Sequence, residues 1–165
     1  MNQAVGVAIL GCGLIGRKRS KALADSKLVV CSDLDENRAK SLADDFPGCE
    51  STTDWRAAVQ RTDVEVVVVA TTNDALVETS LAAVQAGKNV LVEKPAARNL
   101  IELDILVAAV QKHNVLVRVG FNHRYHPALL KARQLVDAGE LGELMFVRGR
   151  YGHGGRGGRT KLVWV

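Results

Sequence analysis

Residues 4–16 read AVGVAILGCGLIG, and the prediction of the fold begins with these residues. Their apolar run has the length of a β-strand and passes directly into a GxGxxG turn that would open a helix. Gly11 permits the tight turn, Gly13 lets the backbone approach a diphosphate, and Gly16 lets the helix pack close to the strand. The stretch therefore predicts a dinucleotide-binding turn, and the alternative is a glycine turn with a purely structural role.

An acidic residue further along supports a coenzyme site. Asp33 ends the next apolar run, 22 residues after Gly11, where a carboxylate binds a ribose diol. Because a carboxylate repels the 2′-phosphate of NADP, we predict NAD as the cofactor and NADP as the less favoured one. The basic cluster Arg17, Lys18 and Arg19 leaves a phosphate site open as an alternative, although such clusters are more often solvated.

Short apolar runs alternate with longer segments of helical periodicity up to residue 120. This alternation is typical of α/β proteins with a doubly wound parallel sheet, the Rossmann arrangement, in which helices cover both faces. Turn and capping residues predict where the helices begin and end. The predicted strands are 4–10, 28–32, 64–71, 89–92 and 115–119, with a weaker one at 49–51. The helices with such signals are 75–86, 100–113 and 127–138, and the signals are Gly87, Asn99, Asn114, Pro127 and Gly139.

The composition is that of a globular chain. Its 165 residues are 47% hydrophobic and 24% charged, which excludes disorder and suits about one domain. The apolar stretch at 4–16 is shorter than the roughly 20 residues of a membrane-spanning helix. The basic cluster follows this stretch, unlike that of a secretory signal, so we expect a cytoplasmic protein with no membrane partner. The three cysteines form no CxxC pair and are expected to be reduced thiols.

The chain changes character towards its C-terminal end. Residues 1–111 carry a net charge of −3, whereas residues 112–165 carry +7. We expect a nucleotide-binding domain at 1–120 and, at 121–165, the first helix and strand of an incomplete α+β second domain, since these cannot bury a core alone. The predicted strand at 143–151 has no sheet to join, and such an exposed edge favours a homo-oligomer.

Glu93-Lys94-Pro95 directly follows the predicted strand 89–92. The carboxyl ends of parallel strands form the ligand crevice, so a lysine here can reach a substrate. Its ammonium could hold a substrate hydroxyl or take part in a proton relay, and Pro95 restricts Lys94 to an extended backbone. The alternative is a surface Glu–Lys pair before a turn.

An ordered set of motifs resembles one enzyme family. The GCGLIG turn is followed by ATTNDALVETSLAAVQAGK at 70–88, NVLVEKPAARN at 89–99 and VGFNHRYHPALLKA at 119–132. This set is similar to the glucose-fructose oxidoreductase, inositol dehydrogenase and MocA (Gfo/Idh/MocA) family over residues 4–155. The resemblance implies a Rossmann domain followed by an open-faced antiparallel sheet domain. It also implies NAD(P)-dependent hydride transfer between nicotinamide and a small-molecule substrate, a sugar, cyclitol or nucleotide-sugar alcohol.

The resemblance implies roles for individual residues. Lys94 matches the catalytic-site lysine of the family's Glu-Lys-Pro motif. The residues matched to cofactor binding lie in the glycine turn, at the ribose-binding acid, after the strand 64–71, in the Glu-Lys-Pro motif and in the loop that enters the second domain. They are Gly11, Gly13, Leu14, Ile15, Gly16, Asp33, Thr71, Thr72, Asn73, Glu93, Lys94, Pro95, Arg124 and Tyr125.

Departures from the family leave a rival hypothesis open. Thr72 replaces the usual proline, and Leu76 occupies a place often held by histidine. The family also carries an Asp and a His as a proton relay in the second domain, and no part of this chain matches that pair. The rival is therefore a catalytically incomplete nucleotide-binding module, in a chain truncated within its second domain.

Two further motifs are weak. His123 and His126 have HxxH spacing, but no further cysteine or acidic cluster completes a metal site. The segment GHGGRGGR is a single arginine–glycine repeat, whereas RNA-binding segments depend on many repeats and on stacking aromatics. We therefore predict no metal and no nucleic-acid partner.

Overall fold

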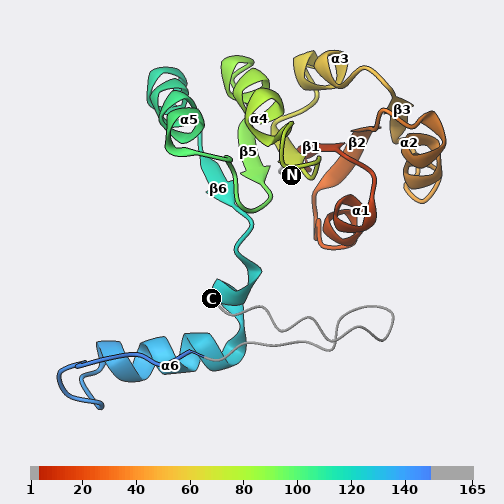
Figure 1. Ribbon diagram of the computed structural model, residues 1–165. Helices are drawn as coiled ribbons and strands as arrows, with labels where there is room; N and C mark the ends of the chain where they lie inside the picture. Colours follow the sequence, from red (N-terminus) through yellow and green to blue (C-terminus); the bar gives the residue numbers. More distant parts are fainter. Residues whose placement is uncertain (1–3, 150–165) are drawn as a thin grey trace, which may run out of the picture. The chain divides into compact units, whose positions relative to one another are not determined.

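The computed structural model describes residues 4–149, and Figure 1 shows the course of the chain. Contacts within the chain divide it into two units, one ending at Phe121 and the other beginning at Asn122. Within residues 4–149, no helix has both the length and the apolar character needed to cross a membrane.

The first unit is built on one parallel sheet of six strands. The strand order is β3-β2-β1-β4-β5-β6, and every neighbouring pair is parallel. The order reverses at β1, and a ligand crevice forms at such a point, outside the carboxyl ends of the strands. In chain order the elements are β1 Gly6–Leu10, α1 Leu14–Ser20, β2 Lys27–Ser32, α2 Glu36–Ala43, β3 Glu50–Thr52, α3 Trp55–Gln60, β4 Val66–Val69, α4 Leu76–Gln85, β5 Asn89–Val92, α5 Leu100–His113 and β6 Val117–Val119.

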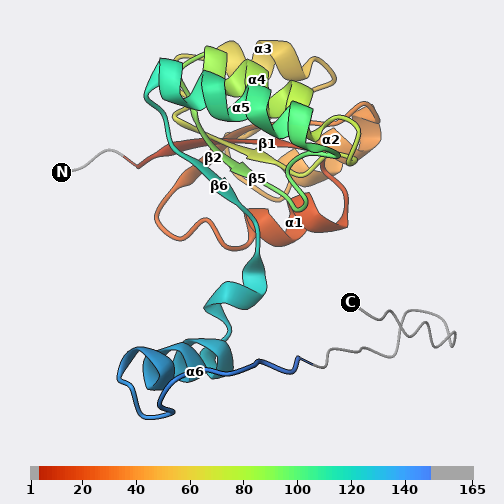
Figure 2. The same cartoon turned by 60° about the vertical axis from the view of Figure 1, so that its left-hand side comes forward.

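Helices cover both faces of the sheet. Helices α3, α4 and α5 lie on one face and α1 on the other, as Figure 2 shows. The buried side chains form two apolar clusters that match these faces, one including Val59, Leu76 and Leu106, the other including Ala39 and Leu42 of α2. Burial on both faces is the reason that the strands are apolar at every position and not only at alternate ones.

The predicted fold class is confirmed. The strand predicted at 64–71 is observed as Val66–Val69, and the weak one at 49–51 as Glu50–Thr52. Helix ends also follow the predicted signals. The Asn99 side chain accepts a hydrogen bond from the backbone N–H of Glu102 at 2.9 Å, and Asn114 ends the same helix with a φ of 52°.

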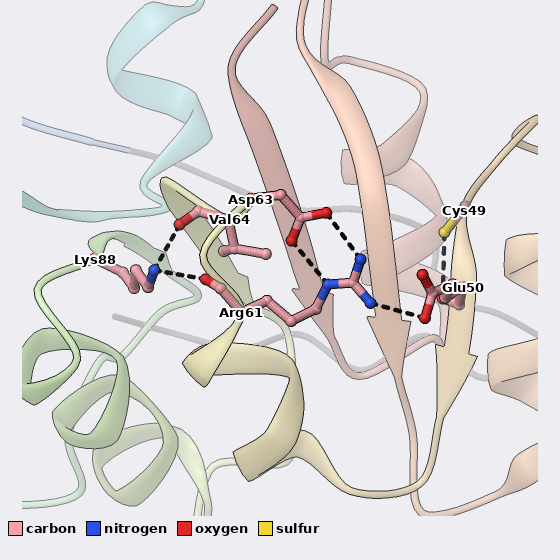
Figure 3. A network of polar contacts seen from close by, with 6 residues as sticks. All are labelled: Cys49, Glu50, Arg61, Asp63, Val64 and Lys88. Atoms are coloured by element: carbon pink, nitrogen blue, oxygen red, sulfur yellow. Dashed lines mark hydrogen bonds and ion pairs between the residues drawn. The ribbon is translucent and has the colours of Figure 1, made fainter.

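A polar network joins the amino ends of β3, β4 and β5 (Figure 3). The guanidinium of Arg61 donates to both carboxylate oxygens of Asp63, at 2.9 and 2.8 Å, and to Glu50 at 2.8 Å. These hydrogen bonds lower the pKa of Asp63. The Lys88 ammonium donates to the backbone carbonyls of Arg61 and Val64, at 2.7 and 2.8 Å. The network links the segments that precede β4 and β5 to the start of β3, at the amino ends of the strands, and the ligand crevice is expected at their opposite, carboxyl ends.

The second unit begins with a 3-10 turn η1, Asn122–Tyr125, and helix α6, Pro127–Asp137. Pro127 takes the first helical position, as predicted. Gly139 follows the helix with a φ of 73°, a conformation that glycine adopts without strain.

The strand predicted at 143–151 is wrong over residues 143–149, which have no regular secondary structure. Residues 150 and 151 lie outside the described part of the chain. A strand is stable only when its backbone pairs with another strand, and the described residues of the second unit provide none. The self-association predicted from this strand therefore has no strand to carry it in residues 143–149.

Candidate functional site

The glycine turn between β1 and α1 is tightly packed at two of its three glycines. Gly11 has a φ of +92°, and a Cβ there would lie 2.4 Å from the carbonyl oxygen of Ala70. A Cβ at Gly16 would lie 1.9 Å from the carbonyl oxygen of Gly11. At Gly13, by contrast, a Cβ would meet no heavy atom within 4 Å. The protein fills the space beside Gly11 and Gly16 and leaves it open beside Gly13.

Helix α1 begins without a side-chain cap. Gly13 is its N-cap residue, and no side chain accepts a hydrogen bond from the first turn. Leu14 and Ile15 are the first two residues of the helix, so their backbone N–H groups have no acceptor within the helix and can serve a ligand. Uncapped N–H groups at a helix start attract anions such as a diphosphate.

Asp33 is held in a fixed orientation beside this turn. One carboxylate oxygen accepts a hydrogen bond from the backbone N–H of Cys12 at 2.8 Å, and the other accepts one from the N–H of Asp35 at 3.0 Å. Each oxygen keeps a further lone pair. The carboxylate can therefore accept hydrogen bonds from two neighbouring hydroxyl groups, as a ribose diol would donate them.

A cleft of about 440 Å³ opens at the carboxyl ends of β1, β2 and β4. Its lining comes from four parts of the chain that are distant in sequence: the glycine turn, the end of β2 with α2, the start of α3, and the end of β4 with α4. The lining residues are Leu10, Gly11, Gly13, Ser32, Asp33, Leu34, Asp35, Arg38, Trp55, Ala70, Thr71, Thr72, Ala75 and Thr79. The Thr72 side chain also hydrogen bonds to Asp74 and lowers the pKa of that carboxyl.

The cleft brings together five of the residues predicted from the sequence, namely Gly11, Gly13, Asp33, Thr71 and Thr72. Gly16 lies beneath the turn, packed on Gly11. The other residues predicted to bind the cofactor do not line this cleft; they are Leu14, Ile15, Asn73, Glu93, Lys94 and Pro95 in the first unit and Arg124 and Tyr125 in the second.

Sequence reasoning missed several lining residues. Trp55, Arg38 and Thr79 belong to helices whose first turns face the cleft. The signal that could have found Trp55 is its place directly after a strand and a capping aspartate, because such a residue lies at the carboxyl edge of the sheet.

Glu93 of the Glu-Lys-Pro motif forms a partly buried ion pair with Arg19 of α1. The Arg19 Nε donates to Glu93 Oε1 at 2.6 Å, and its Nη2 contacts the same oxygen. The Glu93 side chain is 12% exposed and that of Arg19 is 21% exposed. The surface Glu–Lys pair considered from the sequence is therefore wrong, since Glu93 is buried against an arginine. Lys94 itself is exposed.

The ion pairs also restrict the basic cluster at the start of α1. Arg17 donates to Asp45 at 3.2 Å and to the Ser41 hydroxyl at 2.7 Å, and Arg19 is held by Glu93. Two of the three cationic side chains are thus engaged by side chains of the protein, which weakens the alternative of a phosphate site in this cluster.

The three cysteines are free thiols, as predicted. Cys12 and Cys31 are buried, and Cys12 donates its S–H to the carbonyl oxygen of Ser32 at 3.4 Å. Contact with the Cys12 side chain and burial raise the pKa of the Cys31 thiol to about 12. Contact with Cys31 and burial likewise raise the pKa of Cys49. The thiols of Cys31 and Cys49 therefore stay protonated at neutral pH and are poor nucleophiles.

The strand order, the open glycine beside the cleft and the fixed carboxylate of Asp33 define a dinucleotide-binding Rossmann domain. The model of the oxidoreductase family with an NAD-binding Rossmann fold, Gfo/Idh/MocA, matches residues 5–121. The chain belongs to this family, and its cofactor is NAD.

Curated relatives extend the match. The chain is 31% identical over 160 residues to levoglucosan dehydrogenase of Pseudarthrobacter phenanthrenivorans, which covers 90% of the chain and 41% of that enzyme. It is 32% identical over 146 residues to inositol 2-dehydrogenase 2 of Saccharopolyspora erythraea, covering 86% of the chain and 43% of the enzyme. The chain thus spans less than half the length of the relatives it matches.

Among solved structures, levoglucosan dehydrogenase in complex with NADH and levoglucosan superposes with a TM-score of 0.80 at 31% identity. The match covers 85% of this chain and 41% of that one. The similarity therefore extends past the Rossmann sheet, while more than half of the longer protein has no counterpart here.

Proposed function

We propose that this chain is the coenzyme-binding part of a dehydrogenase that transfers a hydride between NAD and an alcohol carbon of a sugar, cyclitol or nucleotide sugar. The observation that carries the proposal is the cleft in which the fixed carboxylate of Asp33 lies beside the open space at Gly13. Relatives named for levoglucosan and inositol support a polyhydroxylated small-molecule substrate.

In this proposal each group of the cleft binds a different part of the coenzyme. The backbone N–H groups of the turn from Gly11 to Gly16, including those of Leu14 and Ile15, hold the diphosphate. Asp33 accepts hydrogen bonds from the adenosine ribose. The segment Thr71–Asn73 after β4 supports the middle of the coenzyme, which supplies the hydride chemistry when bound.

The Glu-Lys-Pro motif would serve the substrate side. Lys94 is exposed at the carboxyl end of β5, where its ammonium can hold a substrate hydroxyl during proton transfer. Glu93 does not approach the ligand in this proposal, because Arg19 already binds its carboxylate. It positions the strand end from which Lys94 projects.

We also propose that residues 121–165 open a second domain for substrate binding and oligomerisation, and that Arg124 and Tyr125 contribute to cofactor binding. The coverage of the relatives, 41% and 43% of their lengths, supports this.

The test is a fluorescence titration of the chain with NADH and NADPH. A carboxylate and a phosphate about 4 Å apart repel each other by up to about 4 kcal/mol near a protein surface, so we expect NADH to bind at least about tenfold more tightly. The Asp33→Ser variant should show a smaller ratio of NADH affinity to NADPH affinity than the wild-type chain. No NADH binding would refute the proposed function, and a preference of the wild-type chain for NADPH would refute the role of Asp33.

A further inference from the structure

One wall of the cleft includes the indole ring of Trp55. Trp55 is the first residue of α3, and the side chain of Asp54 caps this helix by accepting hydrogen bonds from the N–H groups of Arg56 and Ala57, at 2.9 and 3.2 Å. Trp55 is half-buried and packs against the apolar core. Among the residues that line the cleft it is the one aromatic side chain.

The guanidinium of Arg56 covers part of this ring, 4.1 Å from the ring centroid. The same guanidinium donates to Glu78 on α4. The packing of Trp55 against the apolar core restricts the rotation of the indole, and Arg56 adds a contact from the solvent side. A ring that is already ordered loses little conformational entropy when a flat ligand packs on it.

Ser32 adds a polar group at the same wall. Its side chain is 2% exposed, and its Oγ has no hydrogen-bond partner in the described part of the chain. Its backbone carbonyl is already used, accepting from the N–H of Gly11 at 2.8 Å. A buried hydroxyl without a partner is unfavourable, and this one lines the cleft next to Asp33. Rotation about the single side-chain torsion of Ser32 can turn the hydroxyl towards a ligand.

We propose that Trp55 and Ser32 form a purine-recognition pocket, in which the indole stacks on the adenine of the coenzyme and the Ser32 hydroxyl hydrogen bonds to the edge of the base. The inference rests on the proposed function, because it takes Asp33 as the ribose ligand. A base joined to that ribose lies beside Asp33, and Ser32 is the adjacent residue of the chain. A purine is flat enough to stack on an indole and carries hydrogen-bonding groups along its edge.

The chain offers a matched control for Ser32. Ser80 is also buried, at 0% exposure, and its Oγ likewise lacks a partner among the described residues, but it does not line the cleft. Ser32→Ala and Ser80→Ala therefore remove the same kind of group, one inside the pocket and one outside it. Both variants should fold, because deleting an unpaired hydroxyl is neutral or stabilising.

The experiment measures the affinities of NADH and of ADP-ribose, which lacks the nicotinamide, by isothermal titration calorimetry. We expect Ser32→Ala to weaken both ligands by about 2- to 12-fold, as for one lost hydrogen bond, and Ser80→Ala to leave both unchanged. Trp55→Leu should weaken both by about 5- to 150-fold, and Trp55→Phe by less, because phenylalanine keeps an aromatic face.

The outcomes separate the two proposals. A wild-type chain that binds neither NADH nor ADP-ribose refutes the proposed function. A wild-type chain that binds both, with Ser32→Ala equal to Ser80→Ala or with Trp55→Leu unchanged, overturns the purine pocket alone. If circular dichroism shows that Trp55→Leu does not fold, the affinities of Trp55→Phe, Ser32→Ala and Ser80→Ala still test the purine pocket.

Discussion

Replacing Gly13 by alanine should separate coenzyme binding from folding. Gly13 has a φ of −71° and a ψ of −163°, which any L residue adopts, and a Cβ there meets no protein atom within 4 Å. The gain from a stiffer unfolded chain is about 0.4–1 kcal/mol, and the weaker capping by alanine offsets it. We therefore expect the free energy of unfolding to change by less than about 1 kcal/mol.

The same methyl group occupies the space through which the backbone approaches a diphosphate. Losing one charge-assisted hydrogen bond costs about 1.5–3 kcal/mol, so the affinity for NADH should fall by about 10- to 150-fold. The assay pairs urea denaturation with a fluorescence titration of NADH. Wild-type affinity in Gly13→Ala, at unchanged stability, would refute the assignment of the diphosphate to this turn.

Gly16→Ala provides the contrast. Its Cβ would lie 1.9 Å from the carbonyl oxygen of Gly11, which is backbone and cannot rotate away. The turn must shift, and such overpacking costs about 1–3 kcal/mol of stability. This variant should lose stability and NADH affinity together, whereas Gly13→Ala should lose affinity alone.

Two further predictions concern charged side chains outside the cleft. Lys94→Ala should leave the affinity for NADH within a few-fold, because Lys94 does not line the cleft, and should remove any residual dehydrogenase activity towards sugar alcohols, measured as NADH formation. An unchanged rate would remove Lys94 from the mechanism. Asp63 has a lowered pKa in the fold, so its pairing stabilises the protein above about pH 4 and the contribution disappears as the pH falls through the lowered pKa. The stability difference between wild type and Asp63→Asn should therefore be constant from about pH 5 to 8 and shrink towards pH 2, and a difference that grows on acidification would contradict this.

The sheet could be predicted from the sequence because its signals are local. A strand buried on both faces is continuously apolar, so the run of four valines that forms β4, Val66–Val69, predicts a strand without any information about neighbouring strands. Helix ends are also local, since the Asn99 cap bonds to a residue three positions away. The strand predicted at 143–151 failed for the opposite reason: strand formation depends on a partner that an apolar pattern does not supply.

Only those site residues that belong to a sequence motif could be predicted. The glycine turn and Asp33 follow from spacing, whereas Trp55 reaches the cleft through the sheet order, which places β3 next to β2. The pairing of Glu93 with Arg19 joins residues 74 positions apart. No spacing rule connects them, because their contact depends on how α1 packs on the sheet, where it contacts β1 and β4.

Gly120 lies directly beside the ion pair of Arg19 and Glu93. A Cβ at this position would lie 2.8 Å from Arg19 Nη2 and 2.9 Å from Glu93 Oε1, so the bare backbone rests directly on the two charged groups. The polypeptide leaves the sheet at this point, immediately after β6. The missing side chain at position 120 therefore leaves room for this ion pair, and a larger residue there would have to displace the end of the Arg19 or the Glu93 side chain.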